Sequence, residues 1–188
     1  MEKKKTLILV AVLAVVLILA AVAYQFLRST QGNDALPSAV QSSTSTQQEQ
    51  AVQLPSFTIY DPQGQPVQSA DFSGKPTVIN FWATWCAYCK EELPDFQTAY
   101  ETYGDRINFV MIDAVDGQQE TVALGEAYIA ENGYTFPVYF DTDMDAVLSC
   151  GVTGFPSTLF VSAQGEILFA WPGYLEGEQL DRLLASML

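Results

Sequence analysis

The fold of this chain is determined by the stretch TVINFWATWCAYCK, residues 77–90. Residues 77–82 form a continuous apolar run of the kind that makes a strand buried on both faces of a sheet. A helix is predicted to begin at Cys86, so that Cys86 and Cys89 both lie on its first turn. Unpaired backbone N–H groups and the positive end of the helix dipole favour a thiolate there. The thiolate is the nucleophile in disulfide exchange, so the pair predicts redox chemistry.

Strands and helices alternate on both sides of this stretch. Further strands are expected at residues 57–60, 66–67, 107–113, 137–140, 157–161 and 167–171. Helices are expected at residues 86–103, 120–132, 144–150 and 176–188. Turn sequences at residues 61–64 and 162–165 join two strand pairs into hairpins. We therefore predict an α/β, three-layer fold with a mixed central sheet and helices on both faces.

Residues 1–28 are predicted to be a transmembrane anchor. The apolar run of residues 7–23, extended by residues 24–27, reaches the roughly 20 residues needed to cross a bilayer. Three lysines at residues 3–5 precede the run, so the positive-inside rule places the N-terminus in the cytoplasm and the catalytic domain outside it. The alternative is a signal peptide cleaved at the small-x-small site of residues 21–23. The apolar run is long for a signal peptide, which favours an uncleaved, single-pass anchor.

Two segments follow the anchor. Residues 29–53 are rich in Ser, Thr, Gln and Ala, with too few large apolar side chains to fold. We expect them to be a flexible linker with a reach on the order of 25–30 Å. Residues 54–188 are expected to form one domain with one core.

The composition excludes several kinds of site. The chain has no histidine, which excludes Cys–His and Ser–His catalytic pairs and imidazole copper sites. An all-cysteine zinc site needs two pairs, and only Cys150 remains beyond Cys86 and Cys89. We therefore expect neither a metal nor a cofactor. A net charge of −14 argues against nucleic acid as a partner.

Three stretches, taken in order behind a membrane anchor, resemble the thioredoxin superfamily, and within it the membrane-anchored TlpA/ResA branch. They are FTIYDPQG at residues 57–64, GKPTVINFWATWC at residues 74–86 and GFPST at residues 154–158. The resemblance runs from about residue 54 to the end. It implies a thioredoxin-like fold with an N-terminal hairpin and an additional helix-strand unit at residues 120–140. It also implies that Pro156 is a cis-proline that sits against the active-site sulfurs.

The resemblance assigns roles to residues of the motif. Cys86 is expected to be the attacking, more exposed sulfur, and Cys89 the deeper one that resolves the mixed disulfide. Cytoplasmic thioredoxins carry a buried Asp where this chain has Asn80, an amide that cannot titrate. ResA-like proteins instead carry a Glu three residues after the second cysteine, the position of Glu92. We expect Glu92 to hold or remove the proton of the buried thiol, the alternative being an ordinary surface acid beside Glu91.

The residues expected to line a substrate groove are Trp85, Ala87, Tyr88 and Phe155. Tyr88 departs from the branch, which commonly has Pro before the second cysteine. The strong oxidants and isomerases of the superfamily commonly have His there. The chain has none, so we expect a reductant. Cys150 is expected to be a small buried hydrophobic residue on a short helix.

The resemblance implies a thiol-disulfide oxidoreductase that reduces protein disulfides outside the cytoplasm. Its electrons are expected from a transmembrane partner that donates thiol reducing equivalents. The substrates suggested by the branch are apocytochrome c and other oxidised exported proteins, including methionine sulfoxide reductases. The domain itself is expected to be monomeric.

Three other functions occur on the same fold. In peroxiredoxins the reactive cysteine follows Pro-x-x-x-Thr-x-x-Cys, and here Thr84 lies only two residues before Cys86, so the spacing fails. Copper-delivery modules pair their cysteines with a distal His, which this chain does not have. A disulfide-forming oxidase stays open, because only the reduction potential separates it from a reductase.

Overall fold

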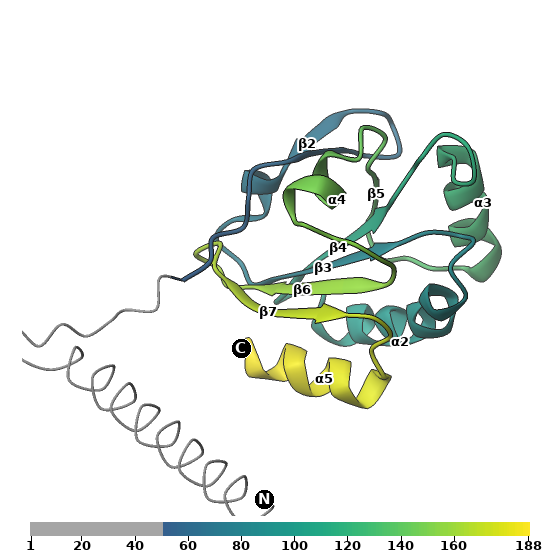
Figure 1. Ribbon diagram of the computed structural model, residues 1–188. Helices are drawn as coiled ribbons and strands as arrows, with labels where there is room; N and C mark the ends of the chain where they lie inside the picture. The colour runs from purple at the N-terminus through teal and green to yellow at the C-terminus, as the bar shows by residue number, and fades with distance from the viewer. Residues whose placement is uncertain (1–50) are drawn as a thin grey trace, which may run out of the picture. The chain divides into compact units, whose positions relative to one another are not determined.

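The computed structural model describes residues 51–188 of the chain. The strands are β1 (Thr58–Tyr60), β2 (Pro66–Gln68), β3 (Thr77–Trp82), β4 (Asn108–Asp113), β5 (Val138–Phe140), β6 (Ser157–Val161) and β7 (Ile167–Pro172). The helices are the 3-10 helix η1 (Ser69–Phe72), α2 (Ala87–Tyr103), α3 (Val122–Asn132), α4 (Asp145–Ser149) and α5 (Gly177–Ser186). The strands of this described part pair into one sheet in the order β2-β1-β5-β4-β3-β6-β7 (Figure 1).

Strand β3 lies inside the sheet, and all six of its residues are buried. It pairs in parallel with β4 and antiparallel with β6, which places Asn80 between Met111 and Thr158. Parallel neighbours need a crossover connection, and here α2 joins β3 to β4 while α3 joins β4 to β5. Helix α2 therefore begins at the end of β3, where the two cysteines are.

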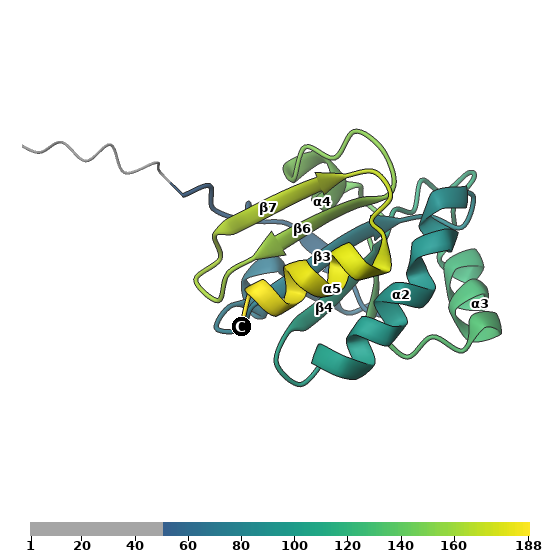
Figure 2. The same ribbon diagram turned by 90° about the horizontal axis from the view of Figure 1, so that it is seen from below.

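The side chains of β3 and β4 alternate between two cores, one on each face of the sheet. Val78 and Trp82 belong to the core under α2, α3 and α5, whereas Ile79 and Phe81 belong to the core under α4. Figure 2 shows α2, α3 and α5 together in front of the sheet, with α4 behind it. The period-two alternation of a strand sends successive side chains to opposite faces, so one apolar run supplies both cores.

The predicted α/β three-layer fold with a mixed sheet is confirmed. The N-terminal hairpin is the antiparallel pair β1–β2, and the additional helix-strand unit is α3–β5, with β5 inserted between β4 and β1. Helix α3 starts later than the predicted residue 120, because Thr121 is its N-cap and accepts a hydrogen bond from Leu124 N. It ends at Gly133, whose φ of 67° lies in the left-handed region that favours glycine at this position. Glu120 is thereby left in the loop before the helix.

The predicted anchor and nearly all of the predicted linker lie outside the described residues. Of the linker, residues 51–53 are described, and two of them run beside the β6–β7 hairpin: Ile167 N donates to Val52 O, and Gln53 forms a bridge with Glu166. Over residues 51–188, no helix combines the length and the apolar character that a membrane span needs.

Candidate active site

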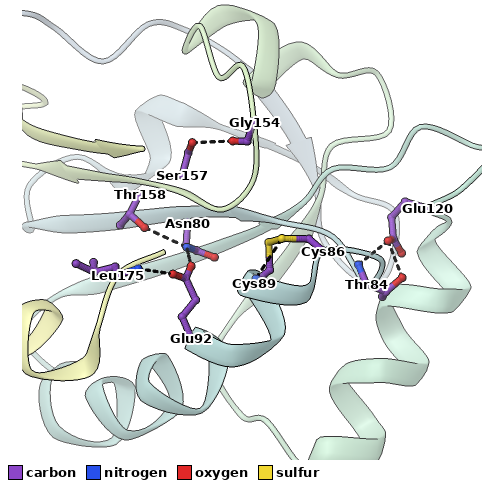
Figure 3. Close-up of a disulfide and its surroundings, with 10 residues drawn as sticks. All are labelled: Asn80, Thr84, Cys86, Cys89, Glu92, Glu120, Gly154, Ser157, Thr158 and Leu175. Carbon is purple, nitrogen blue, oxygen red and sulfur yellow. Dashed lines mark hydrogen bonds between the residues drawn. A yellow bond between two sulfur atoms is a disulfide. The ribbon is translucent and has the colours of Figure 1, made fainter. Parts of the chain in front are cut away.

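Cys86 and Cys89 form a disulfide at the start of α2 (Figure 3). Cys86 is the N-cap of the helix, and its Sγ accepts a hydrogen bond of 3.1 Å from Cys89 N. The exposed fraction is 6% for Cys86 and zero for Cys89. The more accessible sulfur is therefore the one at the helix N-terminus, where backbone N–H groups and the helix dipole stabilise a thiolate.

Glu92 lies in the interior and is no surface acid, whereas its neighbour Glu91 is exposed. Its Oε1 accepts a hydrogen bond of 2.8 Å from Asn80 Nδ2, and its Oε2 accepts one of 2.9 Å from Leu175 N (Figure 3). Asn80 Nδ2 also donates to Thr158 Oγ1 at 3.1 Å. Glu92 thus joins α2, β3, β6 and the segment that leads into α5.

Burial raises the pKa of Glu92 to about 7, and the charge of Asp95 adds to this effect. The hydrogen bonds from Leu175 N and Asn80 act in the opposite direction, because they favour the ionised carboxylate. A carboxyl group with a pKa near neutrality can both hold and release a proton at physiological pH. Asn80 orients this group and cannot itself titrate.

Two exposed aromatic side chains, Trp85 and Tyr88, lie next to the cysteines in the sequence and pack against rings from other segments. Trp85 is 49% exposed and packs edge-on against Phe155, with ring centroids 5.8 Å apart. Tyr88 is 62% exposed and lies 6.2 Å from the ring of Tyr174. Exposed aromatic rings are typical of surfaces that bind proteins. Sequence reasoning named the first three of these residues, and with them the exposed Ala87, but missed Tyr174.

Pro156 is buried, and the Phe155–Pro156 peptide bond is cis, as the resemblance implied. The same loop is closed by a hydrogen bond of 2.8 Å from Ser157 Oγ to Gly154 O (Figure 3). Thr158, which follows directly, is the residue of β6 that contacts Asn80. The loop of residues 154–158 is therefore connected to the dithiol helix through Asn80 and Glu92.

Sequence reasoning also missed the groups on the other side of the disulfide. Glu120 is fully buried, and its Oε2 accepts hydrogen bonds from Thr84 N at 2.6 Å and from Thr84 Oγ1 at 2.7 Å. Thr84 lies two residues before Cys86 in the turn that leaves β3. The one signal available in the sequence was an acid directly before the N-cap Thr121, which is an ordinary position for a surface acid.

Cys150 does not join the site. It is half-buried at the C-terminal end of α4 and packs against the core on the opposite face of the sheet from Cys86 and Cys89. Burial, reinforced by the charges of Asp141 and Asp145, raises the pKa of its thiol to about 12. A protonated, half-buried thiol is a poor nucleophile. As for metals, residues 51–188 contain no group of three or more His, Cys, Asp or Glu side chains placed to bind an ion.

Comparison with known proteins identifies the chemistry of this site. The family model described as the AhpC/TSA family matches residues 51–170. The thiol-disulfide oxidoreductase ResA of Bacillus thuringiensis subsp. konkukian is 27% identical over 135 residues, which cover 72% of this chain and 76% of ResA. The sporulation thiol-disulfide oxidoreductase A of Bacillus subtilis is 31% identical over 108 residues, or 57% of this chain and 65% of the relative.

Solved structures share the fold. The crystal structure of a thiol:disulfide interchange protein of the thioredoxin family from Chlorobium tepidum superposes with a TM-score of 0.63 at 26% identity, covering 73% of this chain and 96% of that one. The chain therefore belongs to the AhpC/TSA family and is a thiol-disulfide oxidoreductase with a thioredoxin-like fold.

Proposed function

We propose that this protein reduces disulfides of other proteins outside the cytoplasm and that the membrane anchor of residues 1–28 holds it there. The observation that carries the proposal is the position of Glu92, a fully buried acid one helical turn beyond Cys89 with a pKa of about 7. This arrangement supplies a proton acceptor to a thiol that is itself buried and would otherwise stay protonated.

The proposed reaction begins with the dithiol form. The Cys86 thiolate attacks one sulfur of a substrate disulfide, and the other substrate sulfur leaves as a thiolate that takes up a proton. Cys89 passes its proton towards Glu92 and attacks the Cys86 sulfur, which releases the second substrate thiol. Two electrons pass from the dithiol to the substrate, and Cys86–Cys89 is left as the disulfide. The aromatic residues Trp85, Tyr88 and Phe155 support the mixed disulfide by covering the reacting sulfurs.

The direction of the reaction is tested by the reduction potential of the Cys86–Cys89 couple. A reductant is expected near the thioredoxin value of about −270 mV or below. A value near −120 mV, as in DsbA, would make the protein a disulfide-forming oxidase instead.

The proposed partners are tested by trapping. A Cys89→Ala variant of the full chain keeps the attacking sulfur and lacks the resolving one, so it should accumulate mixed disulfides on Cys86. The partners expected are apocytochrome c or other oxidised exported proteins, and a transmembrane protein that resupplies electrons. Trapping on Cys89 in a Cys86→Ala variant, and not on Cys86, would reverse the two roles.

The proposed location is tested separately. With an uncleaved anchor, the full-length protein should remain in the membrane fraction, and protease added to the outside of intact cells should remove the domain. Release of the domain at about residue 23 would favour the cleaved signal peptide, and protection from the protease would contradict the extracytoplasmic location.

A further inference from the structure

A second pair of buried acids lies on the Cys86 side of the disulfide. Asp113 is the last residue of β4, and Glu120 lies in the loop between β4 and α3; neither side chain is exposed. Figure 3 shows Glu120 and Thr84 beyond Cys86, on the side away from Glu92. The mechanism above uses Glu92 and leaves these two acids without a role.

Glu120 holds the turn that carries Cys86. Both of its contacts with Thr84, to the backbone N–H and to the hydroxyl, use Oε2 and are shorter than 2.8 Å. Short hydrogen bonds to one oxygen are typical of an ionised carboxylate. The same turn contains a bond of 3.1 Å from Cys86 N to Ala83 O. Fixing Thr84 therefore fixes the backbone from which the Cys86 sulfur projects.

Hydrogen bonds within the loop before α3 fix the position of Glu120. Asp116 Oδ1 accepts hydrogen bonds of 2.8 to 2.9 Å from the backbone N–H groups of Gln118, Gln119 and Glu120. Gly117 N donates to Glu120 O at 3.0 Å and closes the loop. These bonds restrict the backbone of Glu120 and thereby place its carboxylate within hydrogen-bond distance of Thr84.

Asp113 lacks the partners that a buried carboxylate requires. Neither of its oxygens has a hydrogen-bond donor within residues 51–188, and the same is true of Glu120 Oε1. A Cβ at Gly125 of α3 would collide with Asp113 Oδ2, so this glycine makes the space that the carboxyl group occupies. Burying an unpaired anion is expensive, and a buried carboxyl group without donors avoids this cost by keeping its proton.

The other charged groups near the pair do not neutralise it. Lys90 of α2 lies over the ring of Tyr128, with Nζ 5.8 Å from the centroid. The Asp141 carboxylate, beyond β5, accepts from Val147 N of α4. Asp116 is exposed on the loop and Glu126 is exposed on α3. Burial, followed by the charge of Glu120, raises the pKa of Asp113 to about 8.

We propose that Asp113 and Glu120 are positioning residues for Cys86: Asp113 stays protonated, and the Glu120 carboxylate then fixes Thr84 and the turn before the helix. This inference rests on the proposed attack by Cys86. Loss of the Asp113 proton leaves two buried anions that repel each other, which pulls Glu120 away from Thr84. The turn then loosens, and the alignment of the Cys86 sulfur with the N–H groups of α2 is weakened.

The test is the rate at which iodoacetamide alkylates Cys86 in the reduced full-length protein, measured by peptide mass spectrometry between about pH 5 and pH 10. The unmodified protein should show two steps, the Cys86 titration and a second step where Asp113 ionises. Asp113→Asn stays neutral at every pH, so the second step should vanish. Thr84→Val removes the hydroxyl bond and should slow alkylation at neutral pH by roughly 2- to 10-fold, the range expected for one hydrogen bond.

Glu126→Gln is the matched control, since it removes an exposed acid from α3 and should leave the profile unchanged. An Asp113→Asn profile that superimposes on that of the unmodified protein would overturn the proposal. If this variant does not fold, Thr84→Val decides, and an unaltered rate and profile would overturn the proposal equally. Iodoacetamide is not a disulfide, so a two-step profile in a protein that fails to reduce disulfides would contradict only the proposed function.

Discussion

Asn80 donates to a buried carboxylate through an amide that cannot titrate, and this pairing defines the site at the scale of single residues. The titrating acid of this site therefore lies on helix α2 and not on strand β3. It is Glu92, one helical turn beyond Cys89. Its two oxygens are held by donors from β3 and from the segment before α5. The carboxyl group of Glu92, the proposed proton acceptor, is therefore fixed by residues of two other segments of the chain.

Glu92→Gln should flatten the pH dependence of the reduction potential around pH 7 and slow the reduction of a protein disulfide. Gln keeps the shape of the side chain and removes the group that exchanges a proton with the dithiol. Glu91→Gln, at an exposed neighbouring position, is the control and should change neither property. Identical pH profiles for Glu92→Gln and the unmodified protein would leave the proton transfer to solvent.

Trp85→Ala and Tyr88→Ala should impair the reaction with proteins more than the reaction with small disulfides. Both rings are about half exposed or more beside the disulfide, where they can contact a protein substrate. Loss of such a ring is expected to slow reduction of a protein disulfide by about tenfold, or ~1.4 kcal/mol. Leu148→Ala removes an equally apolar, 75% exposed side chain from α4 and should have no effect. Equal slowing with a small aromatic disulfide would contradict a role in protein binding.

Among the elements, helix α3 contains a residue that tertiary packing requires although it has a low helix propensity. Its ends are defined by the N-cap Thr121 and the C-cap Gly133, of which only the C-terminal end was predicted from the sequence. Gly125 in its interior works against helix formation. The structure explains this residue, because the carboxyl group of Asp113 and the ring of Phe140 fill the space beside it.

Gly125→Ala should destabilise the protein, although alanine favours helices by about 1 kcal/mol over glycine. The added methyl group would overlap Asp113 Oδ2, and overpacking of this kind costs about 1–3 kcal/mol. Urea denaturation should show a lower unfolding midpoint with an unchanged slope. Leu124→Ala, at a half-exposed position of the same helix, should stay within about 0.5 kcal/mol. A stabilised Gly125→Ala variant would show that the helix moves away from β4 without cost.

For the molecule as a whole, the buried acids couple stability to pH. The pKa values of Glu92 and Asp113 are raised to about 7 and about 8, mainly by burial. Each group holds a proton in the folded protein at pH values where the unfolded chain has released it. The stability that this contributes is complete below about pH 4 and is lost as pH rises through these two values.

The unfolding free energy of the oxidised protein should therefore fall between about pH 5 and pH 9, by an amount on the order of 3 kcal/mol for each acid. Urea midpoints measured across this range should show the decrease. Glu92→Gln and Asp113→Asn should each reduce the slope, because the substituted amide does not titrate. Midpoints that rise with pH would contradict the burial of these acids in the protonated form.

The sequence by itself determined the features that depend on neighbouring residues. The two-faced apolar run of β3, the cysteines at the start of α2 and the turns of both hairpins are local patterns, and the structure contains each of them. The fold followed, because these patterns appear in the order that the thioredoxin-like architecture requires. Glu92 was predicted from the resemblance to ResA-like proteins, with an ordinary surface acid as the alternative interpretation.

The burial and the hydrogen bonds of Glu92, Asp113 and Glu120 depend on the tertiary structure alone. Leu175 N reaches Glu92 across 83 positions of the chain, and Thr84 meets Glu120 across 36. Whether an acid is solvated or buried depends on segments that are this distant in the sequence. From the sequence alone, an acid is therefore predicted to lie on the surface. Asp113, Glu120 and Tyr174 acquire their places in the site only when β3, β4 and the segment before α5 come together, because burial and charge are properties of the packed molecule.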